Sequence, residues 1–250
     1  MSEEFTGLTA VVTGAGSGIG LATARTFTAA GARVFGLDIN VGAMDGVAEW
    51  IPCDVGSTDS VTTAFITLAA RVDALDILVN NAGIGAVGSV EVATDEEWAR
   101  VLNINVAGIA RVTKAALPML RRSAAASIVN TCSIAATAGL PQRAIYSASK
   151  GAVQSLTLAM AADLIHEHIR VNGVNPGTAD TPWVARLLNL AADPLAERAA
   201  LEHRQPSGRL VTAEEVASAI KFLASPEQLS TTGAMLAVDG GMYGLRVAAG

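Results

Sequence analysis

The chain alternates short apolar runs with longer segments of helical periodicity along nearly all of its 250 residues. Apolar runs of four to eight residues are typical of buried strands, whereas apolar residues spaced three and four apart are typical of amphipathic helices. Strands that alternate with helices pair in parallel through right-handed crossovers, and the helices cover both faces of the sheet. We expect seven such strands, at residues 8–13, 33–37, 49–53, 76–79, 127–132, 169–174 and 234–238.

The segments between these runs have the composition of a single large domain. Helices are expected at residues 21–30, 57–72, 95–122, 145–166, 181–201 and 212–223. Hydrophobic residues make up 51% of the chain and charged residues only 16%, which permits a sheet buried on both faces. No repeat or linker divides the sequence, so we expect one α/β domain over residues 1–250 with a doubly wound, seven-stranded parallel sheet.

The charge balance and the N-terminus argue against several kinds of partner. The net charge is −6 and no basic run is present, so nucleic acid is not expected as a partner. The N-terminus lacks the basic-then-apolar order of a signal peptide, and no apolar stretch is long enough to span a membrane. Cys53 and Cys132 form no metal-ligand spacing, so we expect no metal and a reducing, cytoplasmic environment.

A glycine-rich turn, Gly-Ala-Gly-Ser-Gly-Ile-Gly at residues 14–20, links the first expected strand directly to a helical pattern. Glycine lets the backbone approach a ligand closely, and a helix N-terminus offers unpaired N–H groups and the positive end of the helix dipole. A strand, a glycine turn and a helix in this order predict a dinucleotide phosphate site. The glycine spacing is G-x3-G-x-G, which differs from the common G-x-G-x-x-G.

Asp38 ends the second expected strand, about 20 residues beyond the glycine turn. An acid at this position can accept a hydrogen bond from a ribose 2′-hydroxyl and would repel a 2′-phosphate. Ser17, Ile39 and Asn40, which could have supplied a compensating cation, are uncharged. This pattern favours NAD over NADP, although the same acid could instead cap the turn that follows it.

Polar residues also follow the ends of other expected strands. Asp54 follows the third strand, Asn81 follows the fourth, and residues 175–178 follow the sixth. Because ligands of doubly wound sheets bind outside the carboxyl ends of the strands, these residues are expected to share one site. Asn81 could alternatively bond backbone groups across its turn, whereas Ala82 and Gly83 leave room for a ligand.

Tyr146 and Lys150 lie four residues apart in the long helical pattern that begins near residue 145. This spacing places the phenol and the ammonium on one face of a helix. A free phenol has a pKa of about 10, and a nearby cation lowers it by favouring the phenolate. The pair can therefore exchange protons near neutral pH, although a helix with a half-buried tyrosine and an exposed lysine would show the same spacing.

These motifs together resemble the short-chain dehydrogenase/reductase family, which has a single-domain Rossmann fold. The resemblance covers nearly the whole chain in the family's order and spacing. The residues that carry it are Thr13-Gly14-x-x-x-Gly18-Ile19-Gly20, Asp54-Val55, Asn80-Asn81-Ala82-Gly83, Asn105, Ser133, Tyr146-x-x-x-Lys150, Asn175-Pro176-Gly177 and Asp239-Gly240-Gly241.

The resemblance implies a role for each matching position. Tyr146 would be the general base in oxidation, Lys150 would lower its pKa and bond the nicotinamide ribose, and Ser133 would hold the substrate oxygen. Asn105 would fix a water that leads from Lys150 to solvent. The implied cofactor is NAD, and its contacts would be Gly14, Ser17, Gly18, Ile19, Gly20, Asp38, Asp54, Val55, Asn81, Ala82, Gly83, Tyr146, Lys150, Pro176, Gly177, Thr178 and Thr181.

The second half of the chain resembles a branch that includes cytosolic-type 3-hydroxybutyrate dehydrogenases and 2-keto-3-deoxy sugar acid dehydrogenases. Substrates of that branch are small hydroxy acids. An arginine can hold a carboxylate through two parallel hydrogen bonds, so Arg143, Arg186 and Arg204 are candidate substrate ligands beside Ser133 and Tyr146. Each arginine could equally be an ordinary surface residue.

Residues 181–208 interrupt the alternation of strands and helices, as a small helical substrate lid would. The family usually forms homotetramers through the long helices near residues 95 and 145. Three other functions remain open. They are an NADPH-dependent 3-oxoacyl-thioester reductase, a dehydrogenase of a neutral cyclic or steroid-like alcohol, and a non-catalytic dinucleotide sensor.

Overall fold

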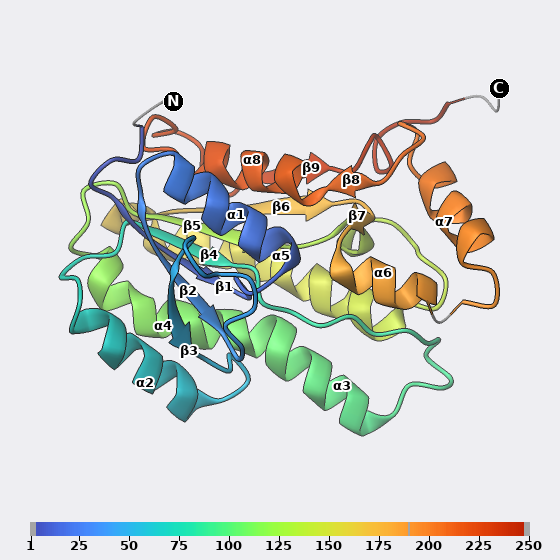
Figure 1. Cartoon of the computed structure of the whole chain (residues 1–250), viewed down its shortest axis with the longest axis horizontal. Helices are drawn as coiled ribbons and strands as arrows, with labels where there is room; N and C mark the ends of the chain where they lie inside the picture. The colour runs from blue at the N-terminus through green and yellow to red at the C-terminus, as the bar shows by residue number, and fades with distance from the viewer. Residues whose placement is uncertain (1–3, 190, 248–250) are drawn as a thin grey trace.

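A seven-stranded parallel sheet forms the centre of the molecule (Figure 1). The computed structural model describes residues 4–189 and 191–247. The strand order is β3-β2-β1-β4-β5-β6-β9, and every neighbouring pair is parallel, so the prediction of a doubly wound sheet is confirmed. The strands are β1 (Thr9–Thr13), β2 (Arg33–Asp38), β3 (Glu49–Pro52), β4 (Ile77–Asn80), β5 (Ser127–Thr131), β6 (Arg170–Pro176) and β9 (Met235–Val238).

Helices cover both faces of this sheet. They are α1 (Gly18–Ala29), α2 (Thr58–Ala69), α3 (Asp95–Leu102), α4 (Gly108–Leu120), α5 (Ala144–Leu164), α6 (Pro182–Asn189), α7 (Pro194–His203) and α8 (Ala213–Ala224). Figure 1 shows α1 and α8 on one face and α2, α4 and α5 on the other. Successive residues of β1 reach both layers, since Val11 joins the core under α2, α4 and α5 and Val12 joins the core under α1 and α8.

The helix expected over residues 95–122 is interrupted. A π-helical turn, Asn103–Ala107, separates α3 from α4. The side chain of Asn105 within this turn is buried and bonds the backbone of Ile84 through both its amide oxygen and its amide nitrogen. Single π turns of this kind are frequent at functional sites, and apolar periodicity carries no sign of them.

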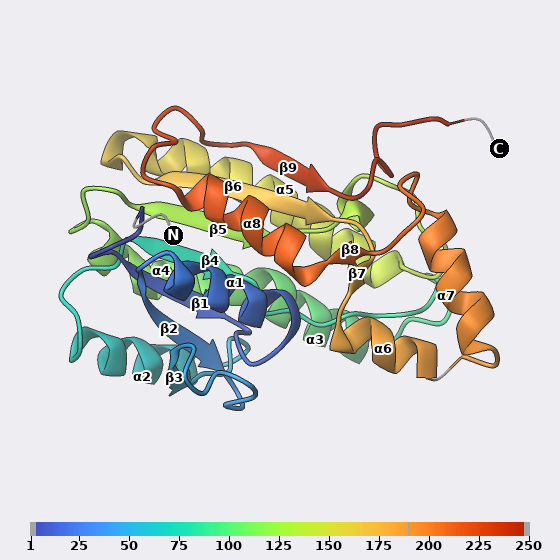
Figure 2. The ribbon, with the colours of Figure 1, turned by 45° about the horizontal axis from the view of Figure 1, so that its top comes forward.

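The segment expected to form a lid contains two helices instead of the single helix expected over residues 181–201. Asp193 caps α7 by accepting hydrogen bonds from the backbone N–H groups of Leu195 and Ala196, so a new helix begins at Pro194. Residue 190, within the expected helix, lies outside the described residues. Figure 2 shows α6 and α7 beyond the carboxyl ends of β6 and β9.

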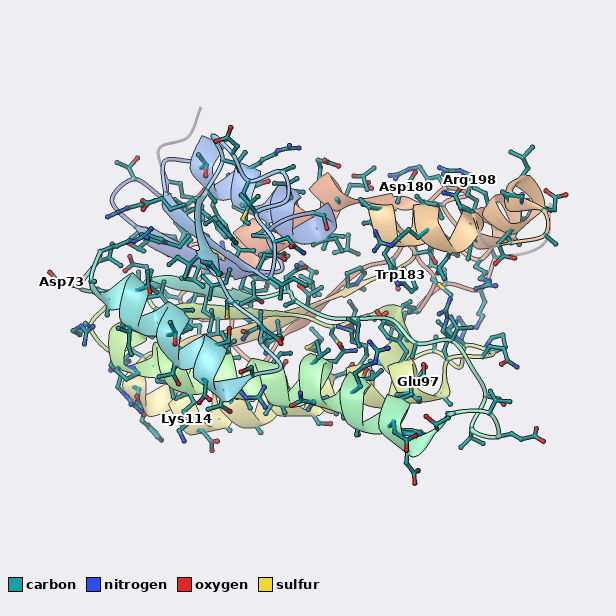
Figure 3. The ribbon with its side chains drawn as sticks, turned by 60° about the horizontal axis from the view of Figure 1, so that its bottom comes forward. Asp73, Glu97, Lys114, Asp180, Trp183 and Arg198 are labelled. Atoms are coloured by element: carbon teal, nitrogen blue, oxygen red, sulfur yellow. The ribbon has the colours of Figure 1, made fainter. Side chains whose placement is uncertain are left out.

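A two-stranded parallel sheet, β7 (Ala179–Asp180) with β8 (Val211–Thr212), joins the two ends of this segment at its base. This sheet has no counterpart among the expected strands, because two-residue strands leave no periodic signal in the sequence. Asp180 also forms an ion pair with Arg198 of α7 at 2.8 Å, and Figure 3 labels both residues. Among the described residues, no helix is both long and apolar enough to cross a membrane.

Candidate active site

A cavity of about 430 Å³ lies at the carboxyl ends of the strands. It brings together twenty of the residues singled out from the sequence, which come from strand ends, α5 and the expected lid. They are Gly14, Ser17, Gly18, Ile19, Asp38, Asp54, Val55, Asn81, Ala82, Gly83, Ser133, Arg143, Tyr146, Lys150, Pro176, Gly177, Thr178, Thr181, Arg186 and Arg204. Gly20 and Asn105 do not line the cavity.

The glycine turn presents the N-terminus of α1 to this cavity. Gly14 and Gly18 have φ angles of +66° and +54°, in the left-handed region that favours glycine. Ser17 is the N-cap residue, but its side chain makes no capping hydrogen bond, and the first turn of α1 contains no acid. The first backbone N–H groups of α1 are therefore available to a phosphate, so the residues present fit a pyrophosphate group.

Gly20 and Asn81 support the turn from behind. A Cβ on Gly20 would collide with the carbonyl oxygen of Gly14. Asn81 Nδ2 donates to the carbonyl oxygens of Thr13 and Gly14 at 3.0 and 3.3 Å, which is the structural alternative raised for this residue. Thr13 Oγ1 accepts from the N–H groups of Asn81 and Ala82, so β4 holds the turn in place.

Asp38 both supports the turn and lines the cavity. Its carboxylate accepts hydrogen bonds from the N–H groups of Gly16 at 3.0 Å and Asn40 at 3.2 Å. The capping role raised as an alternative is thus present, and it does not remove the carboxylate from the cavity wall. Asp54 lines the same wall, so the cavity carries negative charge at this end.

Four cations lie at the other end, contributed by α5, its N-cap and the segment around α6 and α7. They are Arg143, Lys150, Arg186 and Arg204. Lys150 is 5% exposed, and its Nζ donates to the carbonyl oxygen of Thr131 at 2.9 Å. This Nζ lies 5.8 Å from the centroid of the Tyr146 ring, so the ammonium and the phenol share one wall of the cavity, as the helical spacing predicts.

Ser133 lines the same cavity and is the N-cap residue of a short 3₁₀ turn, Ile134–Ala136. Its Oγ accepts from the N–H of Ala135 at 3.1 Å, which orients the oxygen and leaves its proton free to donate. A hydroxyl donor, a phenol and an ammonium lining one cavity can hold an alcohol oxygen and exchange its proton.

Asn105 lies behind the cavity wall. Its Nδ2 donates to Ile84 O at 2.9 Å and to Ser149 Oγ at 3.1 Å, and its Oδ1 accepts from the N–H of Ile84. A Cβ on Gly83 would lie 3.2 Å from Asn105 Oδ1 and 3.8 Å from Lys150 Nζ. Asn105 therefore holds the segment after β4 close to Lys150, and its role in fixing a water stays a prediction.

Arg143 is the most enclosed of the three arginines. Burial lowers the pKa of its half-buried guanidinium, and the nearby Arg204 lowers it further, while Tyr146 and Glu197 oppose these effects. Among the residues that the structure describes, none of the ion pairs includes Arg143. Arg186 and Arg204 line the cavity from its exposed side.

Trp183, which was not among the expected site residues, lines the cavity and lies against Arg143, with 5.5 Å between the guanidinium carbon and the ring centroid. Trp183 directly follows Pro182, the first residue of α6, and this position at the start of the expected lid was the sequence feature that could have indicated a side chain facing the cavity. Apolar side chains complete this wall and carry no sequence signal that separates them from core residues. They are Ile84, Leu140, Val184, Leu187 and Leu201.

The fold and the chemistry of the cavity define the class of this protein as an oxidoreductase that acts on CH–OH groups with a nicotinamide dinucleotide. A family model described as enoyl-(acyl carrier protein) reductase matches residues 14–243. With this match and the relatives below, the chain belongs to the short-chain dehydrogenase/reductase family, and the expectation drawn from its motifs is confirmed.

Curated relatives match nearly the whole chain. The cis-4-hydroxycyclohexanecarboxylate dehydrogenase of Sinomonas cyclohexanicum is 42% identical over 96% of this chain and 98% of its own length. The 2-(S)-hydroxypropyl-CoM dehydrogenase 3 of Xanthobacter autotrophicus is 37% identical over 97% of this chain and 99% of its own. Among solved structures, the aldohexose dehydrogenase of Thermoplasma acidophilum superimposes with a TM-score of 0.92 at 34% identity, covering 100% of this chain and 98% of that one.

Proposed function

We propose that this protein is an NAD-dependent dehydrogenase that oxidises the secondary alcohol of a small hydroxy acid or sugar acid to a ketone. The observation that carries the proposal is the half-buried guanidinium of Arg143, which lies without an ion-pair partner among the described residues. It shares its cavity with Ser133, Tyr146 and Lys150. A buried charge without a partner is costly, and a substrate carboxylate would supply that partner.

The dinucleotide would lie along the cavity from the acidic end to the cationic end. The N–H groups at the start of α1 would hold its pyrophosphate, and Asp38 and Asp54 would meet its adenosine half. At the other end, Lys150 would bond the nicotinamide ribose, with Thr178 and Thr181 beside the carboxamide. When bound, the nicotinamide ring supplies the acceptor for the hydride that leaves the alcohol carbon.

The chain's own residues would handle the proton. Ser133 Oγ donates a hydrogen bond to the substrate oxygen and holds it near the Tyr146 hydroxyl. Tyr146, as phenolate, takes the alcohol proton while the C–H bond breaks, and in the reverse direction it returns that proton. The Lys150 ammonium stabilises the phenolate because opposite charges attract strongly in a partly buried site.

NAD is favoured over NADP by the distribution of charge. The cations that line the cavity all come from α5, its N-cap and the segment around α6 and α7. Asp38 is the charged group next to the glycine turn, and its carboxylate is fixed by Gly16. A 2′-phosphate placed there would meet an anion, and this also disfavours the NADPH-dependent 3-oxoacyl-thioester reductase.

A substrate screen with NAD and NADP tests the proposal. Suitable acids are cis-4-hydroxycyclohexanecarboxylate, the substrate named for the 42% identical relative, together with 3-hydroxybutyrate and an aldonic acid. The carboxamide of the first acid and cyclohexanol serve as neutral controls, and NADH formation is followed. We expect the acids to have higher kcat/KM than their neutral partners. A preference for the neutral compounds would instead support the cyclic-alcohol function, which the apolar walls at Leu140 and Leu187 also suit.

We also propose that residues 181–208, with α6 and α7, form a substrate lid on the single domain of residues 1–250. The chain is further expected to form a homotetramer. The long helix α5 leaves Leu158 half exposed on its outer face, as an interface helix would. Light scattering coupled to gel filtration measures the mass in solution, and a monomer would contradict the expectation.

A further inference from the structure

Trp183, in the first turn of α6, packs directly on the backbone of Gly85. A Cβ on Gly85 would lie 2.7 Å from Trp183 Cε2 and 2.9 Å from Nε1, which is closer than real Cβ contacts occur. The indole therefore fills the space that any other residue at position 85 would need. Figure 3 shows Trp183 on the inner side of α6, toward the body of the molecule.

The guanidinium of Arg143 lies against the same indole. Its Cζ is 5.5 Å from the ring centroid, within the range of a cation–π contact. One guanidinium nitrogen, Nη1, also donates to the carbonyl oxygen of Ala86 at 3.0 Å. Gly85, Ala86, Arg143 and Trp183 thus form one contact unit, which we call the Trp183 cluster.

The backbone of Arg143 is fixed without help from α6. The N–H of Gly88 donates to Gln142 O at 3.0 Å, and the N–H of Ala144 donates to Gly88 O at 3.2 Å. Gln142 has a φ of +57°, a left-handed conformation that is uncommon for residues other than glycine. The backbone therefore holds the base of the Arg143 side chain, while Ala86 and Trp183 determine the direction of its guanidinium.

We propose that Trp183 is a positioning residue for the substrate's acid group, because its indole holds Arg143 in the orientation that binds a carboxylate. This inference rests on the proposed function, since it takes Arg143 as the carboxylate ligand. A free arginine side chain must lose much of its rotamer freedom to bind an anion, and the Trp183 contact removes that freedom beforehand. The indole also keeps water from one face of the guanidinium, which strengthens its attraction for an anion.

The consequence is that acid recognition depends on the docking of α6. When the first turn of α6 lies on Gly85, the indole covers Arg143. When it lifts away, Arg143 keeps its backbone position but loses the contact that orients its side chain. A neutral substrate of the same shape would be less sensitive to this change, because it makes no charged contact.

Glycine-to-alanine variants test the contact with little change in chemistry. Gly85→Ala pushes the indole away from its seat, whereas Gly139→Ala is the matched control, since a Cβ there meets nothing within 4 Å. Trp183→Ala removes the ring, and Trp183→Phe restores an aromatic face. KM and kcat are measured with cis-4-hydroxycyclohexanecarboxylate and with its carboxamide.

For Gly85→Ala and Trp183→Ala we expect KM for the acid to rise about tenfold, the change that loss of one partly desolvated cation–π contact produces. KM should rise much less for the carboxamide than for the acid, because both compounds lose the same cavity wall but only the acid depends on the orientation of Arg143. Trp183→Phe should recover part of the loss, and Gly139→Ala should match the parent.

Binding of the unreactive acid cyclohexanecarboxylate, measured by calorimetry in the presence of NAD, gives a readout that does not need turnover. Its Kd should rise in Gly85→Ala and Trp183→Ala to the same extent as KM for the acid. Equal losses for acid and carboxamide would overturn the proposal, because they would show that Trp183 is only a wall of the cavity.

Arg143→Gln separates this proposal from the proposed function. If it weakens the acid selectively while Trp183→Ala does not, the proposed function stands and the positioning role of Trp183 is wrong. If the parent protein does not prefer the acid to its carboxamide and Arg143→Gln affects both alike, the acid-substrate function fails and this inference fails with it.

Discussion

At the scale of single residues, Tyr146 and Lys150 have a spacing that is common in helices, and only their surroundings in the folded chain indicate a function. The Lys150 ammonium is buried, bonds the carbonyl oxygen of Thr131 and lies near the Tyr146 ring. Burial of an ammonium is costly unless its donors are satisfied or a partner anion is nearby. The cavity that these two residues line also contains Ser133, so the arrangement is consistent with the proton transfer that we propose for this site.

The Tyr146→Phe variant removes the phenolic oxygen and keeps the ring. We expect kcat to fall by roughly 10²- to 10⁴-fold, the usual contribution of a positioned general base. Cofactor binding, measured by calorimetry, should change little, because the ring still fills its place beside Lys150. Turnover close to that of the parent would contradict the assignment of Tyr146 as the base.

The Asp38→Ala variant should narrow the difference in affinity between NAD and NADP. Loss of a hydrogen bond to the charged carboxylate is worth about 1.5–3 kcal/mol, so NAD should bind roughly tenfold to a hundredfold more weakly. NADP should bind to Asp38→Ala at least as tightly as to the parent, because the repulsion between the Asp38 carboxylate and the 2′-phosphate is gone. Asp38 also accepts from the N–H groups of Gly16 and Asn40, so Asp38→Asn is the control that keeps an acceptor while removing the charge. A parent protein that prefers NADP would show that Asp38 does not select NAD.

At the scale of elements, the π-helical turn at residues 103–107 is the clearest departure from the expected pattern. It allows the Asn105 side chain to reach the backbone of Ile84 and the hydroxyl of Ser149 at the same time. Ser149 Oγ in turn donates to the carbonyl oxygen of Tyr146 at 2.8 Å. The turn therefore links the segment after β4 to the first turns of α5, which contain Tyr146 and Lys150.

The N-terminus of α8 carries a complete capping box, formed by Thr212 and Glu215. Hydrogen bonds from Arg209, with a further contribution from the backbone of Thr212, lower the pKa of Glu215 to about 2. A carboxyl group whose pKa is lower in the folded state stabilises the fold above its unfolded pKa of 4.5, and this stabilisation is lost as the pH falls towards 2.

Glu215→Gln should therefore be less stable than the parent at pH 7, and the difference should shrink between pH 4.5 and 2. The expected difference is at most about 1 kcal/mol, because the Arg209–Glu215 pair is largely exposed. Urea unfolding of both proteins across this pH range provides the measurement. Thr212→Ala removes the non-titrating cap acceptor and serves for comparison. A difference between parent and Glu215→Gln that stays constant down to pH 2 would contradict the role of the charge.

At the scale of the whole molecule, ligand binding and folding should be coupled, because the cavity is built from segments far apart in the chain. Residues from the turn after β1, from β5 and from α5 meet there only in the folded state. A ligand that binds only the folded protein stabilises it by about 2.7 kcal/mol at a concentration of 100 Kd. For a chain of this size, NAD at that concentration should raise the Tm by roughly 5–10 °C.

Thermal denaturation with NAD, with NADP at the same concentration, and without either measures this shift. NADP should raise the Tm much less, and the preference should decrease in Asp38→Ala. Equal shifts from the two dinucleotides in the parent protein would argue against NAD selectivity without any assay of turnover.

The sequence by itself determined the layers and most of the strands. Short apolar runs identified the seven main strands, because a parallel sheet that is covered on both faces requires strands with apolar residues in succession, such as those of β1 and β4. They also identified which polar residues gather at one edge, since parallel strands with right-handed crossovers place all their carboxyl ends together. Periodicity did not reveal the two-residue strands β7 and β8, because so short a pairing leaves no repeat in the sequence. It also did not reveal the break between α6 and α7, because this break depends on the local cap at Asp193.

Tertiary structure alone decided which of three similar arginines is enclosed and what encloses it. Arg143, Arg186 and Arg204 look alike in sequence, yet in the folded chain Arg143 alone of the three is half-buried, with its guanidinium against Trp183 and bonded to the carbonyl oxygen of Ala86. It also decided that Asp38 supports the glycine turn while lining the cavity. The physical reason is that periodicity records which face of an element is buried, whereas orientation and desolvation of one side chain depend on residues distant in the chain.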